Sequence, residues 1–315
     1  MRIFYSSDLH GSDTCFKKFV NSAVFFSADV LVLGGDLSGK GVIPIVQKPT
    51  GAYACNFLGR RYILEDEKGM KALERLILHA GFYPSRLTTE EVERATSSDA
   101  ERAELFSAEI REAIRRWIAF AEERLPRHIE FYWMLGNDDP PFMTELLQES
   151  NRLVQCERTR VLLKGSVEMI SLGFSNRTPF GSVRELDEGE MEEMIAELVD
   201  QLQCPQSSIF NFHCPPKESG LDVAPDLRQD LHVVFRGGQP SMVPVGSTAV
   251  RKAIEQFQPV LGLHGHVHES RGIARIGKTL CLNPGSEYSA GILCGAIVNL
   301  DERTGTINSY QFVSG

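Results

Sequence analysis

Short runs of apolar residues recur along the chain, and most end in a polar segment that contains glycine or proline. The run at residues 30–33 is apolar throughout, which is typical of a strand buried on both faces of a parallel or mixed sheet. Strands are predicted at residues 3–5, 30–33, 129–135, 160–163, 168–172, 208–212, 259–263, 272–282, 292–300 and 306–313. Helical spacing of apolar positions predicts helices at residues 16–26, 67–80, 101–125, 188–202 and 247–257, the last with Ser247 as its N-cap. This alternation predicts an α/β fold.

About 95 residues separate the second and third predicted strands, far more than one crossover connection requires. Two or three short strands within residues 43–64, followed by helix 67–80, occupy much of this stretch. We therefore expect a single domain over residues 1–315 with a hairpin or helical cap inserted at about 41–100. The inserted segment is either a lid that selects substrates or a dimer surface, and the side chains in question are Tyr53, Phe57, Arg60 and Arg61.

The composition is ordinary for a globular protein, with 315 residues, 42% hydrophobic and 24% charged. The net charge of -9 argues against nonspecific nucleic-acid binding, which depends on neutralising phosphates. No apolar run approaches the ~20 residues of a membrane helix, and the N-terminus reads as a strand rather than a signal peptide. The expected location is the cytoplasm, where the seven scattered cysteines would be reduced thiols.

Polar side chains that can bind metals follow five of the predicted strands. The carboxyl ends of strands in open α/β sheets are the usual place for ligand sites. Oxygen and imidazole ligands suit manganese, iron, zinc, cobalt or nickel, and the lack of cysteine argues against a closed structural zinc site. Each motif alone is better explained as a turn, a cap or a core histidine, but their joint occurrence favours a metal centre. The residues are Asp8, His10, Asp36, Asn137, Asp138, His213, His266 and His268. For His264, a role supporting catalysis and a structural role are equally consistent with the sequence.

The order of these motifs resembles the calcineurin-like metallophosphoesterase superfamily. The resemblance covers roughly residues 1–40 and 129–300, and rests on Asp8-x-His10, Gly35-Asp36, Gly136-Asn137, His213 and Gly265-His266-x-His268. The segments 34–40, 213–216, 265–270 and 283–286 are similar to those of a prokaryotic branch related to cyclic-nucleotide phosphodiesterases. The resemblance implies a two-sheet β-sandwich flanked by helices, a four-layer fold, with two metals at the strand ends.

The resemblance also implies a role for each residue. Asp8, His10, Asp36 and His268 would hold one divalent metal, and Asp36, Asn137, His213 and His266 the other, with manganese favoured. A hydroxide bridging the two metals would hydrolyse a small phosphorylated substrate, most simply a phosphodiester of nucleotide-like type. The alternatives are a phosphomonoesterase of small metabolites and a non-catalytic metal-binding scaffold of the same fold. The complete set of expected ligands weighs against the scaffold, and a homo-oligomer stays open.

Asp138 departs from the superfamily pattern, in which this position usually holds a histidine that assists the leaving group. An ionised Asp138 that faces the metals would disfavour dianionic monoesters more than monoanionic diesters. It would also be a poor acid for an alkoxide leaving group. These properties predict a preference for phosphodiesters or for good leaving groups. The alternative is that Asp138 turns away from the metals and caps the turn.

Overall fold

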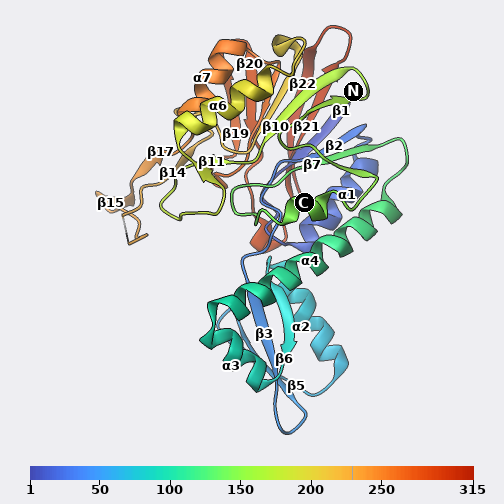
Figure 1. Cartoon of the computed structure of the whole chain (residues 1–315), viewed down its shortest axis with the longest axis vertical. Coiled ribbons are helices and arrows are strands. Elements are labelled where there is room, and N and C mark those ends of the chain that lie inside the picture. The colour runs from blue at the N-terminus through green and yellow to red at the C-terminus, as the bar shows by residue number, and fades with distance from the viewer. Residues whose placement is uncertain (229) are drawn as a thin grey trace.

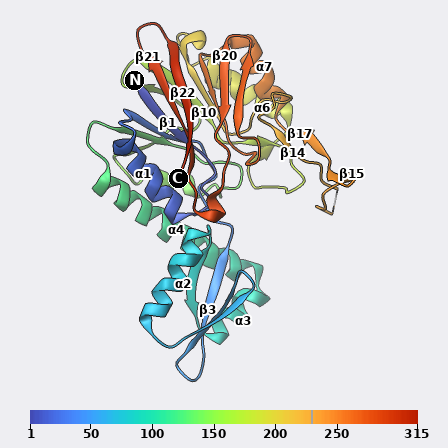
Figure 2. The same cartoon turned by 180° about the vertical axis from the view of Figure 1, so that it is seen from behind.

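The structure is a computed structural model that describes residues 1–228 and 230–315, and it has two six-stranded sheets packed face to face (Figures 1 and 2). The first sheet has the order β22-β21-β1-β2-β7-β8, and the second has the order β19-β20-β18-β13-β10-β9. The strands of the first sheet are β1 Arg2–Ser6, β2 Val30–Leu33, β7 Glu130–Trp133, β8 Leu153–Gln155, β21 Cys294–Asp301 and β22 Thr306–Ser314. Those of the second are β9 Arg160–Leu163, β10 Val167–Leu172, β13 Ile209–Phe212, β18 Leu261–Leu263, β19 Gly272–Ile276 and β20 Thr279–Asn283.

Helices cover the outer face of each sheet, so the predicted α/β two-sheet sandwich with four layers is confirmed. On the first sheet lie α1 Asp13–Phe25, α4 Asp99–Arg124 and α5 Met143–Leu147, and on the second lie α6 Glu188–Val199 and α7 Thr248–Phe257. Ser247 is the N-cap of α7, as predicted, and its side chain accepts a hydrogen bond from Val250 N at 3.2 Å. Within residues 1–228 and 230–315, no helix combines the length and apolar character needed to cross a bilayer.

Successive side chains of the apolar strands point to opposite faces and fill three layers of core. One layer lies between the two sheets, and one lies between each sheet and its helices. Ile3 and Tyr5 of β1 pack between the two sheets, whereas Phe4 packs against the helices on the outer face. A strand points successive side chains to opposite faces, so a strand with core on both sides must be apolar at every position. On the outer face, the rings of Phe16 and Trp117 stack with centroids 4.2 Å apart and join α1 to α4.

Parallel pairing brings the carboxyl ends of the central strands to one edge of the sandwich. In the first sheet β1, β2 and β7 run parallel, and in the second β10, β13, β18 and β20 do. The segments that follow β1, β2, β7, β13 and β18 therefore meet at this edge, although they are far apart in the sequence.

Residues 42–97 form a separate lobe beside the sandwich (Figure 1), which we call the 42–97 lobe. Its sheet has the order β5-β4-β3-β6 and packs around its own small core, which includes Ile45, Leu73 and Ile77. The elements are β3 Val42–Gln47, β4 Tyr53–Phe57, β5 Arg60–Leu64, α2 Glu67–His79, β6 Tyr83–Leu87 and α3 Thr89–Ser97. The three strands within 43–64 and helix α2 match the sequence prediction, whereas β6 and α3 were not predicted.

Short elements complete the chain. They are β11 Ser175–Asn176, β12 Glu185–Leu186, η1 Pro205–Ser207, β14 Val223–Pro225, β15 Phe235–Arg236, β16 Gln239–Pro240, β17 Met242–Pro244 and η2 Tyr288–Ala290. All seven cysteines lie in the described part of the chain and are free thiols there.

Candidate metal centre

The loops that follow β1 and β2 are hydrogen-bonded to each other along their backbones. Asp8 N donates to Gly35 O at 3.0 Å, and His10 N donates to Asp36 O at 2.9 Å. Asp8, His10 and Asp36 all have positive φ, at 58°, 41° and 52°, and so does His266 at 65°. Such backbone costs free energy for residues other than glycine and persists only where the surrounding structure enforces it. The interlocked loops supply that constraint at Asp8, His10 and Asp36.

The structure brings the predicted ligands together in two neighbouring groups. Asp8, His10 and His268 form one, with 3.1 Å between His10 Nε2 and His268 Nε2 and 3.4 Å between His268 Nε2 and Asp8 Oδ1. Asp36, His213 and His266 form the other, with 3.4 Å between His213 Nε2 and Asp36 Oδ2. The same Oδ2 atom of Asp36 is 3.6 Å from His10 Nε2. Asp36 therefore lies between the two groups.

Asn137 joins the second group through its amide oxygen. That Oδ1 atom is 2.7 Å from His266 Nδ1 and 3.1 Å from His213 Nε2. The seven residues predicted as ligands thus converge at one edge of the sandwich, although they come from both sheets.

His213 shows that the site fits a cation. Its Nδ1 is 2.8 Å from the carbonyl oxygen of Gly34, so Nδ1 carries the proton. In the neutral ring, Nε2 is then a bare lone pair, yet it faces the oxygens of Asp36 and Asn137, which are also acceptors. Lone pairs that face one another repel, so a proton or a metal ion must lie between these atoms. Burial lowers the pKa of His213, but the Asp36 carboxylate outweighs it and raises the pKa to about 9, so a proton fills this position unless a metal does.

The protonation states of four other ligands suit metal binding. Burial alone raises the pKa of Asp8, but the hydrogen bond with His268 and the charge of His213 lower it to about 2. The pKa of Asp36 is also well below its ordinary value, because the charge of His213 outweighs burial. Burial lowers the pKa values of His10 and His266 to about 4. At neutral pH the carboxylates are ionised and these two imidazoles are neutral, as metal ligands must be.

The carboxylate of Asp138 faces the cluster. One of its oxygens lies within 4.8 Å of ligand atoms of His10 and Asp36, and its backbone N donates to Asp36 Oδ1 at 3.0 Å. Lys40 Nζ donates to Asp138 Oδ2 at 2.5 Å and Ser182 Oγ donates to Oδ1 at 2.6 Å. The Asp138 carboxylate at the site therefore forms an ion pair with Lys40. Sequence reasoning missed both partners, because they lie 98 and 44 positions away along the chain.

Asp139 holds two of the ligand-bearing loops together, and it too was missed as a functional residue. Its fully buried carboxylate accepts hydrogen bonds from Leu37 N at 3.0 Å, Ser38 N at 2.7 Å and Gly136 N at 2.8 Å. Arg184 supports the same loop, because it donates to Gly136 O at 2.8 Å and pairs with buried Glu157. The adjacent carboxylates of Asp138 and Asp139 were the one available signal, and nothing in the sequence pointed to Arg184.

His264 is not brought into the cluster. Its ring is fully buried, and Nδ1 lies 2.8 Å from the carbonyl oxygen of Phe212. Its Nε2 faces Gly262, where an added Cβ would lie 2.7 Å away. Burial lowers the pKa of His264 to about 4, so the ring is neutral. Of the two roles that the sequence left open, this placement favours the structural one.

Glycines allow the loops to approach this closely. A Cβ atom on Gly136 would lie 2.1 Å from Asp36 Oδ1, and one on Gly265 would lie 2.4 Å from Asp8 Oδ2. Both distances are far below van der Waals contact, so these positions exclude any side chain.

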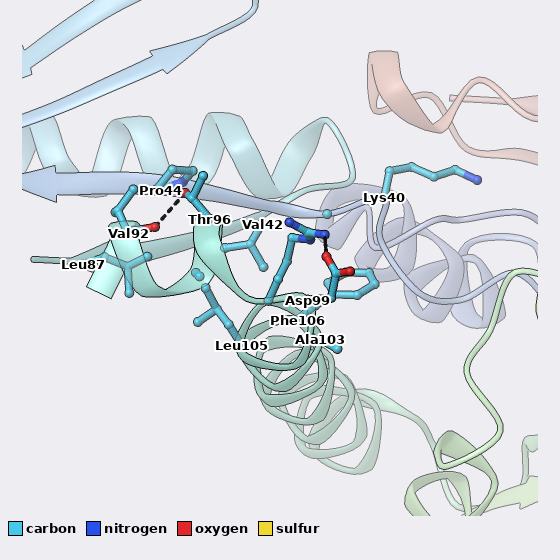
Figure 3. A pocket seen from close by; sticks show the side chains of 13 residues that line it. Lys40, Val42, Pro44, Leu87, Val92, Thr96, Asp99, Ala103, Leu105 and Phe106 are labelled. Carbon is cyan, nitrogen blue, oxygen red and sulfur yellow. Dashed lines mark hydrogen bonds and ion pairs between the residues drawn. The ribbon is translucent and has the colours of Figure 1, made fainter. Parts of the chain in front are cut away.

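An apolar groove begins at Lys40 and runs between β3, α3 and α4. It has a volume of about 540 Å³ and is lined mainly by aliphatic side chains and Phe106. In Figure 3, the Lys40 side chain extends away from the other labelled residues of the groove. Lys40 thus connects the groove to Asp138 at the cluster.

The two facing sheets share this cluster at one edge, which is the architecture implied by the resemblance to metallophosphoesterases. The comparisons with known proteins agree with that architecture. One solved structure aligns over 99% of this chain and 98% of its own, with a TM-score of 0.58 and 17% identity. The protein TT1561 of Thermus thermophilus aligns over 100% and 97%, with a TM-score of 0.53 and 14% identity. At these identities the likeness shows the fold alone.

A curated relative from Methanocaldococcus jannaschii, the uncharacterized protein MJ1162, is 30% identical over 162 residues. The match covers 51% of this chain and 66% of the relative, slightly less than two thirds of its length. No model of a known protein family matches the chain. An archaeal phosphodiesterase aligns over the whole of both chains with 11% identity, but its TM-score of 0.35 is too low to support a conclusion.

Proposed function

We propose that the chain is a phosphoester hydrolase that works with two divalent metal ions, manganese being the favoured one. The observation that carries this proposal is the position of Asp36 between two groups of imidazole and carboxylate ligands. One metal would be held by Asp8, His10, Asp36 and His268, and the other by Asp36, Asn137, His213 and His266. When bound, such a pair supplies Lewis acidity and an activated water near neutral pH.

The surrounding residues orient these ligands before any metal or substrate arrives. Gly34 O fixes the ring of His213, so that Nε2 points into the site. His266 N donates to both carboxylate oxygens of Asp8 at 3.1 Å, which fixes that carboxylate against the opposite sheet. Removing a group that hydrogen-bonds to a metal ligand typically lowers metal affinity 10–100-fold.

The leading substrate class is a phosphodiester of nucleotide-like type. The charge argument for diesters rests on an anionic Asp138, and Lys40 offsets that charge at 2.5 Å. This ion pair is the specific observation that favours the second candidate, a phosphomonoesterase of small metabolites. Because Lys40 neutralises Asp138, the proposed metal centre would stay positive enough to attract a dianionic monoester.

Turnover of bis-nitrophenyl phosphate and nitrophenyl phosphate with added manganese tests the proposal, together with a panel of nucleotide diesters and monoesters. We expect metal-dependent hydrolysis, faster for the diester in the wild type, with Asp138→His shifting activity towards the monoester. A wild type that prefers the monoester selects the second candidate. A lack of turnover with every divalent metal tried would contradict the proposal and favour a non-catalytic scaffold.

A further inference from the structure

A second cavity adjoins the cluster on the side of His268. It has a volume of about 500 Å³ and is lined mainly by residues 268–271 and 284–289, and we call it the Tyr288 pocket. His268 forms part of its wall, and the same residue belongs to the first group of ligands. The pocket therefore shares a wall with the candidate metal centre, so a group attached to a phosphate at that centre has room to extend into it.

Tyr288 lies at the boundary between the cluster and the pocket. Its ring centroid is 4.7 Å from that of His10 and 5.9 Å from that of His268, and it meets the His268 ring edge to face at 83°. The side chain also lines the pocket and is partly exposed. A planar group in the pocket would therefore meet an aromatic surface directly beside two of the predicted metal ligands.

The 42–97 lobe and helix α1 hold Tyr288 in this position. Gly81 of the lobe approaches so closely that an added Cβ would lie 2.8 Å from Tyr288 Cε2. Tyr288 belongs to η2, and directly after η2 the carbonyl oxygen of Gly291 accepts a hydrogen bond from Lys18 Nζ at 2.7 Å. The ring is thus supported from two elements before any ligand arrives, which lowers the entropy cost of binding.

The charged side chains of the pocket indicate which group it binds. Glu269, Arg271 and Glu287 line it and are exposed to solvent. Two carboxylates repel a second anionic group, and three charged side chains make a poor environment for a hydrocarbon. A neutral planar group with both hydrogen-bond donors and acceptors suits the aromatic ring, the carboxylates and the guanidinium together. A nucleobase has these properties.

We propose that the Tyr288 pocket binds the nucleoside part of the substrate, with Tyr288 packed against the base. The inference rests on the proposed phosphoesterase function, in which the metals would hold the phosphate beside His268. The carboxylates of the pocket accept hydrogen bonds from amino groups of the base or hydroxyl groups of the ribose, and Arg271 donates to acceptors on the base. Because every base has an aromatic face, the pocket selects nucleotides over alkyl or sugar phosphates and tolerates different bases.

The test is calorimetric binding of three ligands to the manganese-loaded protein: adenosine monophosphate, ribose 5-phosphate and inorganic phosphate. We expect the wild type to bind adenosine monophosphate more tightly than ribose 5-phosphate. Tyr288→Ala should weaken binding of adenosine monophosphate roughly 10–100-fold, the effect typical of losing a stacked base. Bound manganese and the affinity for inorganic phosphate should be unchanged in this variant. Tyr288→Phe keeps the ring and should bind all three ligands as the wild type does.

Two further variants separate base binding from loss of structure. Arg271→Met leaves the Tyr288 ring in place and should weaken adenosine monophosphate more than ribose 5-phosphate. Tyr310→Ala is the matched control, because Tyr310 is also partly exposed, at 39%, but does not line the pocket. Equal wild-type affinities for adenosine monophosphate and ribose 5-phosphate, or equal losses for all three ligands in Tyr288→Ala, would overturn the proposal. Selective binding of adenosine monophosphate without metal-dependent hydrolysis would support the pocket and overturn the phosphoesterase function instead.

Discussion

Asp36 combines a left-handed backbone with a carboxylate that contacts both groups of ligands. Its φ of 52° disfavours most substitutions, but asparagine tolerates this region well. Asp36→Asn therefore keeps the shape of the residue and one acceptor oxygen while it removes the charge. The substitution separates the metal-binding role of the carboxylate from its role in the fold.

We expect Asp36→Asn to reduce manganese affinity at least 10–100-fold, the range typical of losing only a supporting group. The measurement is the manganese retained per chain after dialysis, with the circular dichroism spectrum as the check on folding. Asp99→Asn is the control, since Asp99 is exposed and pairs only with Arg102 among the ion pairs of the described residues. Unchanged manganese binding in Asp36→Asn would remove Asp36 from the ligand set.

Gly265 tests the close packing of the two loops. In Gly265→Ala the new Cβ would lie 2.2 Å from Ser7 Oγ and 2.4 Å from Asp8 Oδ2, so Asp8 must move. We expect a loss of about 1–3 kcal/mol in the free energy of unfolding and a clear drop in manganese affinity. Denaturant unfolding and metal titration measure the two effects. Gly189→Ala, in α6 with open space around it, should leave both values nearly unchanged.

At the scale of elements, the sequence predicts those whose residues repeat a simple pattern. Strands β1, β2 and β7 could be predicted because a strand with core on both faces must be apolar throughout. The strand β6, Tyr83–Leu87, carries Pro84 and Arg86 at positions that break such a run, and its pairing with β3 is a long-range contact. Helix α3 buries none of its residues, so no run of core positions marks it in the sequence.

The candidate site also contains residues that a local sequence pattern predicts and residues that only long-range contacts bring in. Its ligands could be predicted because each follows an apolar run that ends in a loop containing glycine or proline. Lys40, Ser182 and Arg184 act through contacts that only the folded chain creates, and no local pattern marks them. The capping box of α3, Thr88 with Glu91, was the overlooked local signal that could have revealed that helix.

Glu188 joins α6 to α7 and provides a test of this connection. From the first turn of α6 it accepts hydrogen bonds from Ser247 Oγ at 2.7 Å, Thr248 N at 3.0 Å and Ala249 N at 2.8 Å. It thereby satisfies amides at the N-terminus of α7, where negative charge is favourable. We expect Glu188→Gln to lower the free energy of unfolding by about 1–2 kcal/mol at neutral pH.

The effect of Glu188 should depend on pH in one direction. Burial raises its pKa, but the hydrogen bonds from Ala249, Ser247 and Thr248 outweigh burial, so the folded-state pKa lies below the ordinary value. The stabilisation is therefore complete above the ordinary pKa and is lost as the pH falls through the lower, folded-state pKa. Denaturant unfolding should show the difference between wild type and Glu188→Gln shrinking as the pH falls below the ordinary pKa of glutamate. Glu192→Gln, which breaks an exposed pair with Lys252, should cost less than about 0.5 kcal/mol.

At the scale of the whole molecule, the proposed metals would connect the two sheets. Asp8, Asp36 and Asn137 follow strands of the first sheet, and His213 and His266 follow strands of the second. The 42–97 lobe has its own core and contributes no residue to the groups of ligands in the described chain. Metal binding should therefore stabilise the sandwich edge far more than the lobe.

We expect manganese at about 100 times its dissociation constant to stabilise the chain by about 2.7 kcal/mol, because it binds the folded state alone. In a chain of this size that corresponds to a rise in Tm of several degrees, with a return to the starting value after chelation. Hydrogen exchange should slow at the loops that follow β1, β2, β7, β13 and β18, and stay constant in β3 and β4 of the 42–97 lobe. Asp36→Asn should lose both responses. Equal slowing in the lobe would mean that metal acts on the chain as a whole, and no slowing at the loops would place the metal elsewhere.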